Sequence, residues 1–237
     1  VVPQIWWSYV PFHLGSTFEG EQPSTINDFF DLEKFPGKRG VHTWGNGIVE
    51  MALYASGVAI ADIYDVLDTQ EGQDMVFAKL DTIKDSVVFW SAGAKPLDLV
   101  NSGEVSMSIA YNGRIGGAVL ADGADYVTVW DGQVLEEEWL VLMNGAPNRA
   151  QAIHFLIHAS STQAQADQAH WINYAPMRPS ALPIMEAGEP WFNTGATIME
   201  HMPTTDEHMK GGILADPDWW ADNGQAVSDR YAAWMAK

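Results

Sequence analysis

The feature that most constrains the fold is an alternation of strand-like and helix-like segments. Segments rich in aromatic and β-branched residues lie at 4–10, 41–43, 87–90, 105–111, 126–130 and 133–143. Between them, apolar residues recur at helical spacing, as Val76, Leu80 and Ile83 do. This alternation predicts an α/β layered fold with a largely parallel sheet, whose ligand crevices lie at the ends of the strands.

The same periodicity predicts where the helices begin and end. They are expected at 27–32, 48–56, 59–67, 71–84, 96–101, 114–120, 147–159, 162–170 and 225–236. Asn46 is a candidate N-cap for the second helix, and Pro147 suits the first position of a later one. Residues 173–217 are rich in Pro, Gly and Met and give only short helical hints. The length allows either one large domain or two modest lobes.

The charge balance narrows the range of partners. The chain has 31 acidic against 12 basic residues, a net charge of −19. This field repels nucleic acid and anionic membranes and attracts cationic small molecules, although acidity alone also keeps a soluble protein dispersed. There is no cysteine, which excludes disulfides and thiolate metal sites.

Neither a membrane span nor a signal peptide is recognisable. No run approaches the roughly 20 apolar residues of a membrane helix, and the opening Val1-Val2-Pro3 lacks a basic n-region. We therefore expect either that a signal was removed or that the sequence starts inside the gene.

Three consecutive acids, Glu136, Glu137 and Glu138, lie inside the apolar strand VLEEEWLVLM. Strand alternation places Glu136 and Glu138 on one face, about 7 Å apart. Without a cation between them, repulsion and burial would raise at least one pKa, whereas an organic ammonium would keep both ionised. The alternative interpretation is the solvated end of a strand.

The sequence gives weaker indications of a metal site or an enzyme active site. His154 and His158 have the spacing of metal ligands on a helix, but Phe155, Leu156 and Ile157 between them favour a half-buried helix face. His201 and His208 hint weakly at a surface metal site. The motifs G-x-S-x-G and His-Glu-x-x-His are absent.

Six runs spaced along the chain carry a resemblance. They are DFFDLEKFPGKRG at 28–40, EMALYASGV at 50–58, FAKLDTIK at 77–84, AYNGRI at 110–115, NGAPN at 144–148 and DWWADN at 218–223. In this order they resemble bacterial extracellular solute-binding proteins of family 1, of the spermidine/putrescine receptor type. The likeness covers almost the whole chain.

The resemblance implies a type II periplasmic binding protein fold, with two α/β lobes joined by crossing hinge strands. It also implies an N-terminally truncated chain in which the first part of lobe one is absent. On this basis we expect a hinge-proximal strand at 1–10, lobe two at 11–130, the later part of lobe one at 131–180, and at 181–237 a segment that packs back across the lobes.

The resemblance also implies ligand-binding positions. Glu138 matches an acidic position that holds a ligand amine, and Glu136 matches the position two residues before it. Tyr111, before Asn-Gly, matches an aromatic that packs on the methylene chain, and Tyr174 matches a tyrosine ahead of a proline-containing loop. Trp44 lies where a polar contact is usual, and Trp220 is a further candidate.

The function expected from these features is the capture of a polyamine or related cationic amine for an ABC importer. The expected protein is a periplasmic or extracellular monomer that docks on a membrane permease, binds no nucleic acid, cofactor or metal, and has no catalytic residues. A receptor for an opine, amino acid or amine-bearing osmolyte is the nearest alternative. A metal-dependent or hydrolase-like enzyme using His154 and His158, or the glutamate pair, is an alternative from another class.

Overall fold

The computed structural model describes residues 1–187 and 195–237. Within these residues, eight strands form one mixed sheet with the order β3-β2-β4-β1-β6-β8, and β5 and β7 also pair with β1. The strands are β1 Val2–Leu14, β2 Arg39–His42, β3 Val87–Trp90, β4 Met107–Tyr111, β5 Tyr126–Thr128, β6 Val134–Leu140, β7 Ala175–Pro176 and β8 Ile213–Leu214. The prediction of a largely parallel sheet is wrong at its centre, because β1 runs antiparallel to β4, β5, β6 and β7.

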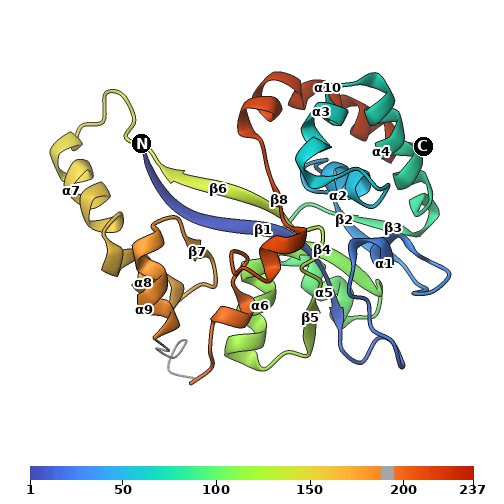
Figure 1. Cartoon of the computed structure of the whole chain (residues 1–237), viewed down its shortest axis with the longest axis horizontal. Helices are drawn as coiled ribbons and strands as arrows, with labels where there is room; N and C mark the ends of the chain where they lie inside the picture. The colour runs from blue at the N-terminus through green and yellow to red at the C-terminus, as the bar shows by residue number, and fades with distance from the viewer. Residues whose placement is uncertain (188–194) are drawn as a thin grey trace.

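The helices pack around this sheet in two groups that the long strands β1 and β6 connect (Figure 1). They are α1 Ile26–Phe30, α2 Ile48–Tyr54, α3 Ile63–Leu67, α4 Gln70–Asp81, α5 Lys95–Asn101, α6 Asn112–Asp122, α7 Arg149–Ala159, α8 Thr162–Ala169, α9 Leu182–Glu186 and α10 Pro217–Met235. Most predicted elements are present within a few residues of their predicted bounds. The helix predicted at 225–236 is longer and begins at Pro217.

The largest core lies under α2, α4 and α10. Val227, Tyr231 and Trp234 form the buried stripe of α10, at the spacing expected for one face of a helix. The Tyr231 hydroxyl donates to the carbonyl oxygen of His42 at 2.9 Å, and Lys84 Nζ donates to the carbonyl oxygen of Trp234 at 2.6 Å. The C-terminal helix is therefore fixed against the β2 side of the sheet.

A smaller core joins α6, α8 and α9 near β7. Beyond it, α7 lies at the far end of the molecule, beside the outer ends of β1 and β6 (Figure 1). Phe155 and Ile157 on α7 are 58% and 65% exposed. His154 and His158 are exposed too, so the prediction of a half-buried helix face is wrong within the described part of the chain. Among the described residues, no helix is long and apolar enough to cross a membrane.

Candidate functional site

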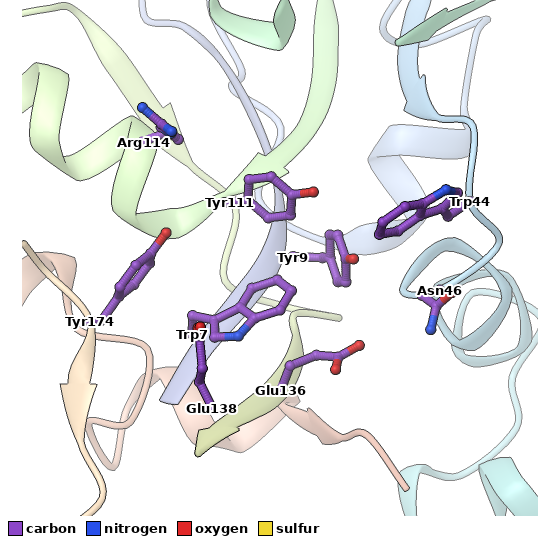
Figure 2. Close-up of a pocket in the computed structure, with 9 residues that line it drawn as sticks. All are labelled: Trp7, Tyr9, Trp44, Asn46, Tyr111, Arg114, Glu136, Glu138 and Tyr174. Atoms are coloured by element: carbon purple, nitrogen blue, oxygen red, sulfur yellow. The ribbon is translucent and has the colours of Figure 1, made fainter. Parts of the chain in front are cut away.

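A cavity of about 410 Å³ opens where β1, β4 and β6 meet α6 and the loop before α2. Its lining is mainly aromatic with three charged groups, and consists of Trp7, Tyr9, Trp44, Asn46, Tyr111, Arg114, Glu136, Glu138 and Tyr174 (Figure 2). The volume and the mixture of apolar walls with a few polar groups are typical of small-molecule sites.

Strand pairing brings the aromatic and acidic walls together. Trp7 and Tyr9 alternate along β1, so they share one face of the sheet. Trp7 pairs with Glu136 across β6, and Tyr9 pairs with Tyr111 across β4. The rings of Trp7 and Tyr111 are 5.2 Å apart and those of Tyr9 and Tyr111 are 5.4 Å apart. Three rings thus form one continuous apolar wall beside a carboxyl group.

The two predicted glutamates lie on the same face of β6 at different depths. Glu136 is half-buried, whereas Glu138 is exposed at the rim. Burial, followed by the nearby carboxyl group of Glu50, raises the pKa of Glu136 to about 7. Among the described residues, neither glutamate has a hydrogen bond or ion pair to a basic side chain. Neither carboxyl group is therefore paired with a cation of the described part of the chain, and both are available to an external one.

Arg114 is the basic residue of the lining. It lies in the first turn of α6, which begins at Asn112 directly after β4. In Figure 2 it lies on α6, above Tyr174 in this view, and the rings of Tyr111 and Trp7 lie between it and Glu136. Burial raises the pKa of Tyr174, and the positive charge of Arg114 opposes this rise. The cavity therefore presents a guanidinium and two carboxyl groups from opposite walls.

A pair of buried amides holds the Arg114 side of the cavity. Asn112 Nδ2 donates to the carbonyl oxygen of Asn173 at 2.9 Å, and Asn173 Nδ2 donates to the carbonyl oxygen of Asn112 at 3.2 Å. Asn112 Oδ1 also accepts from the backbone N–H of Ser8 at 2.9 Å. This network joins β1, α6 and the segment that positions Tyr174. A Cβ on Gly113 would lie 2.2 Å from the Tyr174 ring, so glycine allows this close approach.

The opposite wall comes from the loop between β2 and α2. The Trp44 backbone N–H donates to Nδ1 of His42 at 2.8 Å, and the Trp44 side chain is 63% exposed. Asn46 lines the cavity. The sequence predicted Asn46 as the N-cap of α2, and this prediction is wrong. The N-cap is Gly47, whose φ of 82° favours glycine and whose added Cβ would lie 2.8 Å from the Tyr9 ring.

Of the six predicted site residues, the structure brings Glu136, Glu138, Tyr111, Tyr174 and Trp44 together in this cavity. Trp220, the sixth, is not part of the lining. It lies on α10, where its Nε1–H donates to Glu50 Oε1 at 2.8 Å.

Sequence reasoning missed Trp7, Tyr9, Asn46 and Arg114 as lining residues. Trp7 and Tyr9 could have been found from the strand 4–10, since alternate aromatics share a face. Arg114 lies within the AYNGRI run but gave no signal on its own. No group of three or more metal-ligating side chains occurs in the part of the chain that the structure describes.

The raised pKa of Glu136 gives a prediction for stability. The pKa of Glu136 rises from its usual 4.5 to about 7 in the folded protein. Its contribution to the free energy of unfolding is therefore fully present below pH 4.5 and is lost as the pH rises through 7. Glutamine cannot ionise, so the Glu136→Gln variant should not lose this stability. Between pH 4 and pH 8, its free energy of unfolding should gain about 2 kcal/mol relative to that of the wild type. Urea denaturation at the two pH values measures this. The exposed Glu104→Gln is the control, and an equal gain at both pH values would contradict the assignment.

This protein has a periplasmic binding protein-like fold. The features that indicate it are the mixed sheet, the two long strands between the helical groups, and the aromatic and charged cavity beside these strands. The sequence matches the family of bacterial extracellular solute-binding proteins over residues 5–200, and the chain belongs to this family.

Known relatives agree with this assignment. The chain is 35% identical to the gamma-aminobutyric acid-binding protein of Pseudomonas aeruginosa, over 98% of this chain and 62% of that protein, so it spans less than two thirds of the relative's length. It resembles the structure of the binding protein MotA from A. tumefaciens B6 in complex with glucopine, with 29% identity, TM-score 0.85 and coverage of 99% and 70% of the two chains. It also resembles the Atu4243-GABA receptor, with 31% identity, TM-score 0.81 and coverage of 98% and 68%.

These relatives confirm the wider family predicted from sequence and the fold that it implies. They do not confirm the narrower spermidine/putrescine type, because two of them are named for gamma-aminobutyric acid and the third is in complex with glucopine.

Proposed function

We propose that this protein is the solute-binding component of an ABC importer and captures a small solute that bears both an amine and a carboxylate. The observation that carries the proposal is the placement of Arg114 across the cavity from Glu136 and Glu138. A guanidinium pairs with a carboxylate and a glutamate with an ammonium. The relatives named for gamma-aminobutyric acid and glucopine support this choice, since both names denote amine- and carboxylate-bearing solutes.

The side chains of the cavity offer several favourable contacts to a solute with an amine and a carboxylate. A hydrogen bond to a charged group contributes about 1.5–3 kcal/mol, and a cation over an aromatic ring about 0.5–2 kcal/mol. A dissociation constant of about 1 μM corresponds to about 8 kcal/mol. One ammonium contact, one carboxylate contact and burial of an alkyl chain against Trp7 and Tyr111 are the contributions that offset the cost of ordering the ligand.

A polyamine is the second candidate, and the carboxyl pair favours it. Arg114 argues against it, because a second ammonium that reached the Arg114 side would be repelled. We therefore rank an ω-amino acid or opine, the alternative left open by the sequence, ahead of putrescine. The same lining lacks a metal cluster within the described residues, and we propose a binding role, not an enzymatic one.

We also propose how the chain is divided between two lobes and the hinge strands that join them. Residues 1–10 and the strand after residue 131 would serve as hinge strands, 11–130 as lobe two and 131–180 as part of lobe one. The segment 181–237, which includes residues outside the described ranges, would pack back across both. We place the protein in the periplasm or outside the cell, as a monomer that delivers its ligand to a membrane permease.

Calorimetric titration with gamma-aminobutyric acid, glucopine, putrescine and spermidine tests the proposed function. We expect saturable 1:1 binding that is tightest for a solute with both charges. If no amine-bearing solute produces saturable heat, the proposed function is wrong; if putrescine binds tightest, the polyamine alternative is correct.

Neutralising Glu138 tests the ammonium side of the cavity. Glu138→Gln should weaken gamma-aminobutyric acid binding about 10-fold, the effect of one charged contact at an exposed rim, and should reduce its salt dependence. Calorimetry at low and high salt measures both. Glu137→Gln, on the opposite face of β6, is the matched control and should bind as the wild type does. Equal losses in the two variants would contradict the assignment.

A further inference from the structure

The most exposed ring of the cavity lining is that of Trp44. It is 63% exposed, whereas Tyr9 is buried and the other aromatic rings of the lining are half-buried. In Figure 2 the Trp44 indole lies on one side of Tyr9 and Tyr111, and Tyr174 lies on the other side in this view. An exposed side chain on a loop keeps one position only if other contacts offset the entropy that it loses.

The contacts that fix Trp44 come from His42, the last residue of β2. The Trp44 backbone N–H donates to His42 Nδ1 at 2.8 Å, and the two rings are 4.9 Å apart. His42 is 3% exposed, and its ring meets that of Trp90 edge-on at 4.4 Å. Its carbonyl oxygen also accepts from the Tyr231 hydroxyl of α10 at 2.9 Å. The imidazole is therefore a fixed point beside the loop that carries Trp44.

The imidazole has the protonation state that this hydrogen bond requires. Because Nδ1 of His42 accepts from a backbone N–H, it carries no proton, and the ring proton is on Nε2. Burial lowers the pKa of His42 to about 4, and a hydrogen bond with the backbone of Ser91 opposes this fall. The ring is therefore neutral near pH 7, and Nδ1 remains an acceptor.

The loop that carries Trp44 has little rigidity of its own. Gly45 and Gly47 follow the tryptophan, and Gly47 has a φ of 82°. Glycine leaves a chain more conformational freedom than any other residue. The side chain of His42 therefore supplies a constraint that the sequence Trp-Gly-Asn-Gly does not supply by itself.

From these contacts we propose that His42 is a positioning residue of the ligand site: its Nδ1 holds the loop so that the Trp44 indole covers a bound solute. The inference rests on the proposed function, since a solute in this cavity is what the indole covers. Trp44 contacts the solute, and His42 acts through Trp44. Burial of the exposed indole against the alkyl chain of the solute adds to the affinity, because apolar surface leaves water.

The hydrogen bond is tested first in the protein without ligand, by amide hydrogen exchange followed with nitrogen-15 NMR. In the wild type the Trp44 amide should exchange about 10-fold or more slowly than in an unstructured chain, although its side chain is exposed. His42→Asn keeps an acceptor on Cγ and should keep this protection. His42→Phe keeps a ring but has no acceptor, so the protection should be lost. A wild-type Trp44 amide that exchanges as fast as an unstructured one overturns the inference.

The affinity for gamma-aminobutyric acid then separates positioning from a general effect on the fold. In calorimetry, His42→Phe and Trp44→Ala should each weaken binding about 10-fold, and the double variant also about 10-fold, because the two residues act as one unit. His42→Asn should bind within about 3-fold of the wild type, since the acceptor is restored. The matched control is His13→Phe, which changes another buried imidazole outside the lining and should bind as the wild type does.

Three binding results would overturn the inference. They are wild-type affinity in His42→Phe, wild-type affinity in Trp44→Ala, and a double variant that loses about 100-fold, the product expected of two independent residues. If His42→Phe does not fold, the amide exchange of the wild type and the affinity of Trp44→Ala still decide the question. Absence of binding by every amine-bearing solute overturns the proposed function, while the amide exchange still shows whether His42 holds the Trp44 loop.

Discussion

Replacing Arg114 by glutamine is expected to weaken the binding of gamma-aminobutyric acid about 50-fold while leaving putrescine binding unchanged or tighter. The guanidinium is the basic group of the lining, opposite Glu136 and Glu138. Removing a charged hydrogen bond to a ligand carboxylate costs about 2.3 kcal/mol, which corresponds to this factor. A diamine has no carboxylate to lose, and it gains by the removal of a like charge. Parallel calorimetric titrations with the two ligands measure the change.

The control for this experiment is Arg149→Gln, which removes an equal charge from the exposed start of α7. It should bind both ligands as the wild type does, because the long-range field changes equally in the two variants. Equal losses for both ligands in Arg114→Gln would mean that the arginine acts on the shape of the cavity and not on a ligand carboxylate.

Asn112→Ala is expected to lower the free energy of unfolding by about 3 kcal/mol. The substitution leaves the backbone N–H of Ser8 and the carbonyl oxygen of Asn173 without partners in a buried position. Each buried polar group left unpaired costs about 1–3 kcal/mol. Because the same network positions Tyr174 beside Arg114, ligand binding should also weaken. Urea denaturation gives the stability, and calorimetry gives the affinity.

The matched control is Asn27→Ala, at an exposed position on α1, which should change the free energy of unfolding by less than about 0.5 kcal/mol. If Asn112→Ala unfolds at the same urea concentration as this control, the amide pair does not hold the wall of the cavity together.

Helical periodicity predicted the elements that bury one stripe of side chains. Val76 and Leu80 are buried on α4, as their spacing indicated. The start of α10 was missed because the run DWWADNG is polar and contains Gly224, which hides the period. Two local signals could have located it: Pro217 at the first helical position, and Asp216, whose side chain accepts from the Trp219 N–H at 2.9 Å.

The sheet shows why strand direction is harder to predict than strand position. The aromatic and β-branched character of residues 4–10 predicted a strand, yet β1 is 13 residues long and pairs antiparallel with four others. Which strands pair depends on contacts between residues more than 100 positions apart, such as Trp7 with Glu136. Local patterns contain no information about these contacts.

The candidate site also contains residues that local patterns predict and residues that depend on distant contacts. The glutamate pair was predicted because charge inside an apolar strand is unusual, and alternation placed both side chains on one face. Glu50 could not be predicted, because nothing in IVEMALY shows that this position is enclosed by Trp220 from the far end of the chain. Its position depends on the packing of α10 against α2.

A crystal structure of the protein grown with gamma-aminobutyric acid would show whether this cavity binds a solute with an amine and a carboxylate. We expect one ligand in the cavity, with its ammonium within about 3 Å of the Glu136 or Glu138 carboxylate, its carboxylate against the Arg114 guanidinium and its methylene chain against Trp7 and Tyr111. A ligand bound elsewhere on the protein, or a ligand in this cavity with its amine turned away from both glutamates, would contradict the proposed function.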